Sequence, residues 1–133
     1  VHYAHARCCS VLRHAASDFS EIDQSPSALQ AAKLELLTDS AEIDLLKRMA
    51  EWPRLLEGAA EAREPHRVAF YLTDLAAALH GLWTLGKEDT RMRFLLPDDH
   101  ALTQARLALL QGVSFVIAAG LHVFGVEPME EMR

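Results

Sequence analysis

Three residues near the start of the chain have the types and the spacing of a metal site. His5, Cys8 and Cys9 follow one another at i, i+3 and i+4, so one helix would bring two or three soft ligands onto adjacent faces. Structural zinc takes four ligands, usually from two segments, and the chain has no second cysteine cluster. We therefore expect no metal site, and we expect the thiols to pack as small apolar groups.

Two other residues near the start of the chain have a spacing that suits nucleic-acid binding. Tyr3 and Arg7 are four residues apart, so they meet on one face of a helix. One interpretation is an ordinary cation–π packing contact, which is common on helices. The other is an aromatic platform beside a planar cation, which stacks on unstacked RNA bases and forms hydrogen bonds with them. Spacing alone favours the packing contact and leaves the RNA platform open.

The common catalytic and cofactor motifs do not occur in the sequence. It contains no Gly-x-Ser-x-Gly elbow, no glycine-rich phosphate loop and no dinucleotide fingerprint. The Glu-x-x-His pairs of ferritin-like di-metal sites are also missing. Taken as an isolated chain, this sequence predicts no catalytic residue and no bound cofactor.

Length, charge and cysteine usage narrow the class of protein. The 133 residues suit one domain with one substantial core, and the formal net charge of −6 argues against nucleic-acid binding by bulk electrostatics. RNA binding would need a local basic patch or a larger basic neighbour. The chain begins at Val1 without a basic-then-apolar leader, and Cys8 and Cys9 are too close in sequence to form a disulfide framework. We expect an excised piece, either a processed chain or a cloned domain, from a reducing cytosol.

The first helix is predicted over Val1 to Asp18 and has two distinct faces. Its apolar stripe follows the 3, 4, 3, 4 spacing of an amphipathic helix and consists of Val1, Ala4, Cys8, Val11 and Ala15. The other face carries Tyr3, Arg7, Ser10 and His14. This pattern therefore predicts that one side of the helix is buried and that the other side can contact a partner.

Shorter helices are predicted next. Serine, aspartate and proline indicate a loop over residues 19–33, interrupted by a short helix from about Ser27. Asp39 and Glu42 have the spacing of a capping box, and Pro53 ends the helix that follows. The predicted buried face of that helix consists of Ile43, Leu46 and Ala50, with Leu45 and Met49 alongside. A further short helix is expected from Pro53 to Arg63.

Two long helices complete the predicted bundle. One runs from Pro65 to Leu85 and is expected to end at Gly86, and the other begins after Asp98 and Asp99 and has Gly120 as its left-handed cap. Their predicted buried residues are Val68, Leu72, Leu75, Leu79 and Leu82 in the first, and Leu102, Ala105, Leu109, Val113, Val116 and Ile117 in the second. The predicted fold is all-α, an antiparallel bundle of four to five helices that forms one domain over residues 1–133.

The uncharged run from Ala108 to Val126 is almost long enough to span a membrane. However, Gln111, Ser114, His122 and three glycines interrupt it, and no Lys/Arg cluster or Trp/Tyr belt flanks it. We therefore predict a buried core helix rather than a membrane span.

Several segments resemble one known family in the same order. The opening HYAHARCCSVLRHA resembles the first helix of the C-terminal, DALR-type anticodon-binding domain of bacterial arginyl-tRNA synthetases, whose pattern is Tyr-Ala-His-Ala-Arg before a small apolar stretch. The Glu-Pro-His-Arg run, the following Tyr-Leu, and the closing Gly-Leu-x-x-x-Gly-Val and Glu-x-Met patterns match in order. The insertion over residues 88–98 is similar to that of the longer bacterial branch. The resemblance covers essentially the whole chain.

This resemblance implies a helical bundle that binds the anticodon stem-loop of tRNA(Arg). In that family, ATP and Mg²⁺ are handled by a separate catalytic domain that attaches arginine to the tRNA. The signatures of that domain, of the His-Ile-Gly-His and Lys-Met-Ser-Lys-Ser types, do not occur here. The expected partners are therefore tRNA(Arg) and the catalytic domain of the same polypeptide, with no membrane, and the expected state is a cytoplasmic monomer.

The resemblance also indicates which residues face the RNA. Tyr3 and Arg7 match the family's anticodon-facing tyrosine and arginine, and Trp83 stands where the family usually has a tyrosine. Met132 matches the near-terminal methionine that packs on the anticodon loop, so the tail after Gly125 is expected to return to the RNA face. Arg106 also matches, but we expect it to form a fixed ion pair within the bundle.

The acidic composition supports an alternative hypothesis, a helical protein-interaction module without RNA binding. An apolar groove near Arg7 would favour this alternative, whereas concentrated positive charge there would favour RNA.

Overall fold

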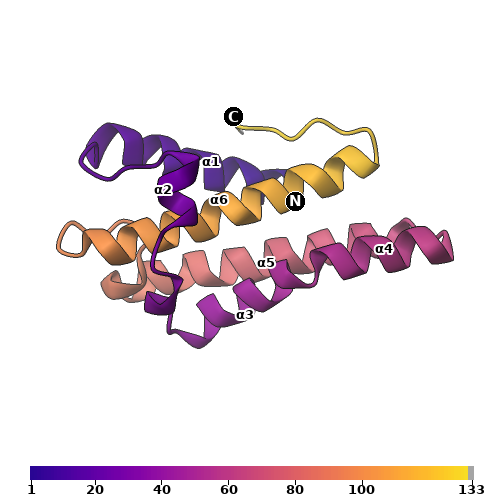
Figure 1. Cartoon of the computed structure of the whole chain (residues 1–133), viewed down its shortest axis with the longest axis horizontal. Helices are drawn as coiled ribbons and strands as arrows, with labels where there is room; N and C mark the ends of the chain where they lie inside the picture. The colour runs from indigo at the N-terminus through magenta and orange to yellow at the C-terminus, as the bar shows by residue number, and fades with distance from the viewer. Residues whose placement is uncertain (132–133) are drawn as a thin grey trace.

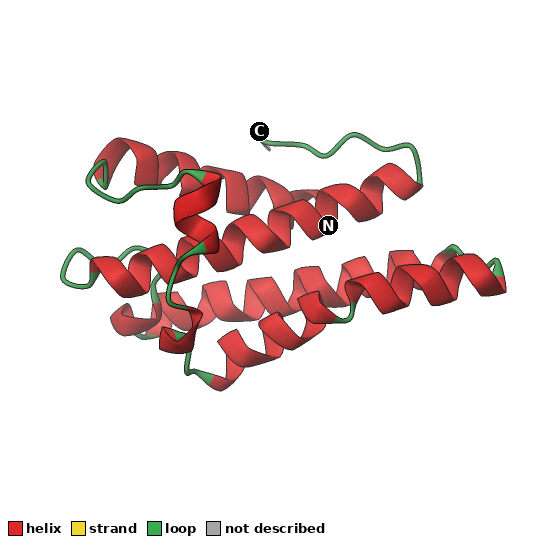
Figure 2. Cartoon of the chain, in the orientation of Figure 1, coloured by secondary structure: helices red, strands yellow, loops and turns green. Residues whose placement is uncertain are grey.

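The chain folds into a bundle of helices. The computed structural model describes residues 1–131, and this part of the chain contains no strand. It consists of the helices α1 (His2–Asp18), α2 (Pro26–Gln30), α3 (Ser40–Ala50), α4 (Trp52–Ala62), α5 (His66–Glu88) and α6 (His100–Val123), with 3₁₀ turns η1 (Leu34–Leu36) and η2 (Thr90–Met92). Figure 2 shows short loops between them. The predicted all-α bundle is confirmed, with the short helix near Ser27 present as α2.

The helices are arranged around the central pair α5 and α6. Figure 1 shows α6 running back alongside α5, with α1 on the far side of α6 and with α3 and α4 on the far side of α5. Helix α2 crosses α6, and the segment after α6 turns back toward the start of α1. The last long helix, α6, therefore forms the central wall of the bundle.

The core is built from the apolar stripes that face this central pair. Leucines of α5 pack against leucines, valine and isoleucine of α6, and burial of each such side chain contributes about 1.5–3 kcal/mol. The fully buried members are Leu72, Leu75, Leu79, Leu82, Leu109, Val113 and Ile117. The stripe of α1 is also buried from Ala4 to Ala15. Leu102 and Val116, predicted to be buried, are only half-buried.

Two glycines predicted to end helices lie inside them. Helix α5 continues past Gly86 to Glu88, and α6 continues past Gly120 to Val123. A Cβ on Gly86 would lie 3.2 Å from the carbonyl oxygen of Met92, and one on Gly120 would lie 2.6 Å from a methyl carbon of Leu72. Both glycines therefore allow close approach of a neighbouring segment, and the predicted caps were wrong.

The cap of α6 is formed five residues later than predicted. Gly125 has φ +70°, the left-handed conformation that glycine adopts without a Cβ clash. Its N–H donates to the carbonyl of His122, and the N–H of Val126 donates to the carbonyl of Leu121, both at 3.0 Å. This is the Schellman pattern, and it reverses the chain direction after α6.

Helix α3 presents a different face to the core than its stripe predicts. Asp39 caps it as expected by accepting from the N–H of Ala41 at 2.9 Å. However, Ile43 and Ala50 are exposed, whereas Glu42 and Leu45 are buried. Glu42 turns inward because Arg106 lies opposite it. Helix α4 begins at Trp52, one residue before Pro53.

Helices α5 and α6 are both long and apolar enough to cross a membrane by length and composition. In the bundle, 50% of the most apolar window of α6 and 39% of that of α5 are buried. Core helices of soluble proteins can have the same length and composition, so this test does not separate a core helix from a membrane span. The absence of a membrane span stays a prediction.

Candidate nucleic-acid interface

Helix α1 positions Tyr3 and Arg7 by burying its opposite side. Ala4 and Cys8 are fully buried, and this fixes the rotation of the helix about its axis. Tyr3 is left 48% exposed and Arg7 half-buried, both facing the second half of α5. The face predicted to contact a partner therefore lies beside α5 rather than on an isolated surface.

The guanidinium of Arg7 lies over two aromatic rings. Its central carbon is 4.4 Å from the centroid of the Tyr3 ring and 4.5 Å from that of the Trp83 ring. Its Nη2 also donates to the Tyr3 hydroxyl at 2.9 Å. The structure thus brings together three residues that the sequence singled out, 80 positions apart at the extremes. Each cation–π contact stabilises the cluster by about 0.5–1 kcal/mol at a partly exposed site.

His80 belongs to the same cluster, and we assigned it no role from the sequence. The Nη1 of Arg7 lies 3.4 Å from the Nδ1 of His80, and the Tyr3 and His80 ring centroids are 5.7 Å apart. Burial lowers the pKa of His80, and the positive charges of Arg7 and the N-terminal ammonium lower it further. A neutral imidazole can accept a hydrogen bond from Arg7, so His80 orients the guanidinium. Its position three residues before Trp83 on the same helix was the available signal.

The C-terminal segment runs back along α1. His5, which is buried, donates from Nδ1 to the carbonyl of Met129 at 2.7 Å. Arg13 donates to the carbonyl of Glu130 at 3.2 Å and lies 3.9 Å from the carboxylate of Glu131. The predicted return of the tail is therefore confirmed as far as Glu131. Met132 lies outside the described residues.

Side chains of α1, together with Trp83 and Glu131, line a cavity of about 420 Å³, which we call the first cavity. This volume is within the range of small-ligand sites. Its lining residues are Tyr3, Ala6, Arg7, Ser10, Arg13, Trp83 and Glu131. Two aromatic rings and two guanidinium groups converge on it, with one carboxylate. The arrangement can stack a planar base and offer N–H donors to its edge.

The cysteines near this cavity are not poised for chemistry. Burial raises the pKa of the Cys8 thiol to about 12, and burial is also the largest cause of the raised pKa of Cys9. A thiol with a raised pKa is a poor nucleophile and a poor metal ligand at neutral pH. The Nδ1 of His5 is engaged by the tail, and residues 1–131 contain no cluster of three or more His, Cys, Asp or Glu able to hold a metal ion.

Arg106 forms the internal ion pair that we expected. Its Nε and Nη2 both lie 2.9 Å from Oε1 of Glu42, and the pair is buried. Burial raises the pKa of the Glu42 carboxyl, and the charge of Arg106 opposes that shift. The Nη1 of Arg106 also donates to the carbonyls of Arg91 and Arg93, at 2.7 and 2.6 Å. Arg106 therefore joins α6 to α3 through the ion pair with Glu42, and to the segment after α5 through these two hydrogen bonds.

The whole sequence is also similar to those of known proteins. The family model described as the DALR anticodon binding domain matches residues 1–132. The chain is similar over its whole length to arginine–tRNA ligases of Rhodospirillum rubrum (58% identical), Parvibaculum lavamentivorans (56%) and Xanthobacter autotrophicus (50%). It spans 23% of the length of each of these relatives.

Proposed function

This chain belongs to the family of DALR anticodon binding domains, and from that membership we propose that it binds the anticodon loop of tRNA(Arg). On this proposal it is one part of an arginine–tRNA ligase. ATP and Mg²⁺, which supply the activation of arginine, would be handled by the catalytic domain of the same polypeptide. The residues of this chain do not fit them, because it has neither a phosphate loop nor, among the described residues, a carboxylate cluster suited to a metal.

The observation that carries the proposal is the position of Arg7 between Tyr3 and Trp83. Its contacts with Tyr3 and His80 use two N–H groups of the guanidinium, and the remaining N–H groups, which donate to no described residue, can bind a base edge or a phosphate. The two rings supply stacking surfaces, and stacking of one base on an aromatic side chain is worth about 1–3 kcal/mol. Because Arg7 is already oriented by its neighbours, little ordering is required when RNA binds.

Local charge supports RNA rather than a protein partner as the occupant. The net charge of the chain is −6, yet among the described residues the first cavity is lined by Arg7 and Arg13 against one carboxylate, that of Glu131. The alternative hypothesis, a protein-interaction module, predicts an apolar groove near Arg7 instead. A phosphate-bearing strand matches a cavity rimmed by two guanidinium groups.

The proposal is tested by replacing Arg7 and measuring binding of tRNA(Arg) by filter retention. Arg7→Ala should weaken binding about tenfold or more, since it removes hydrogen bonds to a base and disorders the two rings. The matched control is Arg54→Ala, which removes the same charge from an exposed position on α4 that makes no ion pair with a described residue. Its affinity should stay within about twofold of the parent, because a single distant exposed charge contributes little to binding.

Helical content should be the same in all three proteins by circular dichroism, because neither arginine contributes to the core. Equal losses of affinity for Arg7→Ala and Arg54→Ala would contradict the assigned role of Arg7.

A further inference from the structure

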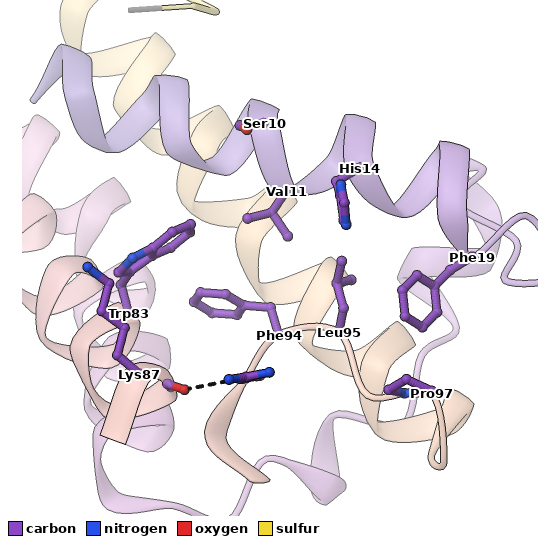
Figure 3. Close-up of a pocket in the computed structure, with 11 residues that line it drawn as sticks. Ser10, Val11, His14, Phe19, Trp83, Lys87, Phe94, Leu95 and Pro97 are labelled. Atoms are coloured by element: carbon purple, nitrogen blue, oxygen red, sulfur yellow. Dashed lines mark hydrogen bonds between the residues drawn. The ribbon is translucent and has the colours of Figure 1, made fainter. Parts of the chain in front are cut away.

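A second cavity of about 540 Å³ adjoins the first. It lies between α1, the last turns of α5 and the segment 93–97 that follows η2, and it shares Ser10 and Trp83 with the first cavity. Figure 3 shows Val11 and His14 pointing from α1 toward Phe94 and Leu95, with Trp83 at one end and Pro97 at the other. The indole of Trp83 thus marks the boundary between two adjoining hollows.

The wall of the second cavity is held in place by hydrogen bonds to two buried side chains. Arg106 fastens the carbonyls of Arg91 and Arg93, and the hydroxyl of Thr103 both accepts from the N–H of Leu96 at 2.9 Å and donates to its carbonyl at 3.1 Å. Gly86 lets this segment lie directly against α5. Although it has little regular structure, the segment is fixed at several points, so the cavity is preformed.

The lining combines an apolar floor with a cationic rim. Val11, Phe94 and Leu95 supply the floor, and the Phe94 ring lies 5.8 Å from that of Trp83. Lys87 and Arg93 are exposed and stand at the rim. Lys87 makes no ion pair with a described residue, and the Nε of Arg93 donates to the carbonyl of Gly86 at 3.4 Å. An apolar slot beside two cations matches a nucleobase with its phosphate.

We propose that the second cavity binds a second unstacked nucleotide of the same RNA strand. Its base packs against Phe94 and Leu95, and its phosphate lies at Lys87 and Arg93. Trp83 then separates this base from the one held over Tyr3 and Arg7. The inference rests on the proposed function and extends it, because it assigns a nucleotide site to the segment after α5. Arg106, which its ion pair with Glu42 fixes in place, acquires a role in positioning that segment.

The test is an NMR titration of the 133-residue chain, labelled at its methyl groups and with nitrogen-15 at its backbone amides, with the anticodon stem-loop of tRNA(Arg). The expected result is intermolecular NOEs between the Leu95 methyl groups and base protons of one loop nucleotide. Replacing that nucleotide by an abasic one should remove these NOEs, while the signals of Tyr3 and Arg7 remain shifted by the RNA. The two sites would then be occupied by different nucleotides.

A charge-matched pair of variants tests the phosphate contact. Lys87→Ala should weaken binding of the stem-loop about fivefold at 0.1 M salt. It should also reduce the steepness of the fall of log K with log salt concentration, the salt slope, by about 0.7, the value of one single-strand phosphate contact. Lys47→Ala, which removes an exposed lysine from α3 on the far side of α5, should leave both unchanged.

The outcomes separate this proposal from the one it rests on. If Tyr3 and Arg7 respond to RNA but Leu95 shows no NOE to a base, the second site is wrong and the first cavity stands. If Lys87→Ala matches Lys47→Ala in affinity and salt slope, the second site is again wrong. If no signal responds to the stem-loop, both proposals fail.

Discussion

A single methyl group added at Gly120 tests how closely α5 and α6 pack. A Cβ there would lie 2.6, 2.7 and 2.9 Å from the two methyl carbons and the Cγ of Leu72. Ordinary carbon contacts lie at about 3.5–4.0 Å, so Leu72 would have to move by roughly 1 Å. It is 2% exposed and has little room to do so. Overpacking of this kind costs about 1–3 kcal/mol.

Gly81 provides the matched control for Gly120. It also lies within a long helix, but a Cβ there would meet nothing within 4 Å, and the position is exposed. Gly81→Ala should therefore stabilise the protein by about 0.5–1 kcal/mol, the ordinary helix-propensity gain over glycine. Since that gain is common to both substitutions, Gly120→Ala should be less stable than Gly81→Ala by about 1–3 kcal/mol.

Urea and thermal unfolding followed by circular dichroism measure this difference. It corresponds to a gap in Tm on the order of 4–12 °C for a domain of this size. Equal stabilisation by both substitutions would show that Gly120 does not set the distance between α5 and α6, and would contradict the packing described here.

Two further predictions concern buried and half-buried charge. Glu42→Ala leaves the guanidinium of Arg106 buried without its carboxylate. It should therefore lower the free energy of unfolding, measured by urea titration, by roughly 3–5 kcal/mol. A loss below about 1 kcal/mol would contradict the role of the pair. The pKa of His80 is lowered in the folded chain from the ordinary histidine value of 6.5. Just below pH 6.5 the unfolded chain therefore binds more protons than the folded one. Because of this difference, the free energy of unfolding should rise as the pH rises toward 6.5. His80→Gln should flatten this part of the pH profile relative to the parent, and an unchanged profile would contradict the neutral His80 at Arg7.

Helix positions and the apolar stripes of α1 and α5 were predictable because periodicity is a local property of the sequence. The same is true of the Asp39 cap and of the helix boundary near Pro53. Contacts over long separations were not predictable in this way. Glu42 is buried because Arg106 lies opposite it 64 positions later, and no pattern within α3 indicates that. As a result, Ile43 was placed on the wrong face.

Glycine roles were the least predictable feature. Gly86 and Gly120 each stand near the end of an apolar stripe, where a left-handed cap is common. Whether such a glycine ends a helix or admits a neighbouring segment depends on what packs against it, which only the tertiary structure shows. Gly125 forms the cap of α6, and the two buried glycines admit η2 and Leu72 respectively.

The candidate site was predictable in part. Spacing indicated that Tyr3 and Arg7 share a face, but it did not show that Trp83 lies over the same guanidinium. The family resemblance supplied Trp83 and Met132, and the structure places the former at the site. Neither spacing nor resemblance singled out His80, and neither indicated that the segment after α5 encloses a second cavity.

The most direct test of the central claim is the fluorescence of Trp83 on addition of RNA. The chain has two tryptophans, and Trp52→Phe leaves Trp83 as the only one while retaining an aromatic ring against Tyr71. Titration with the anticodon stem-loop of tRNA(Arg) should quench this emission by base stacking, with the same Kd as filter binding. The same stem closed by an unrelated loop should not. Binding of the anticodon stem-loop without any change in Trp83 emission would contradict the claim that RNA binds between α1 and α5.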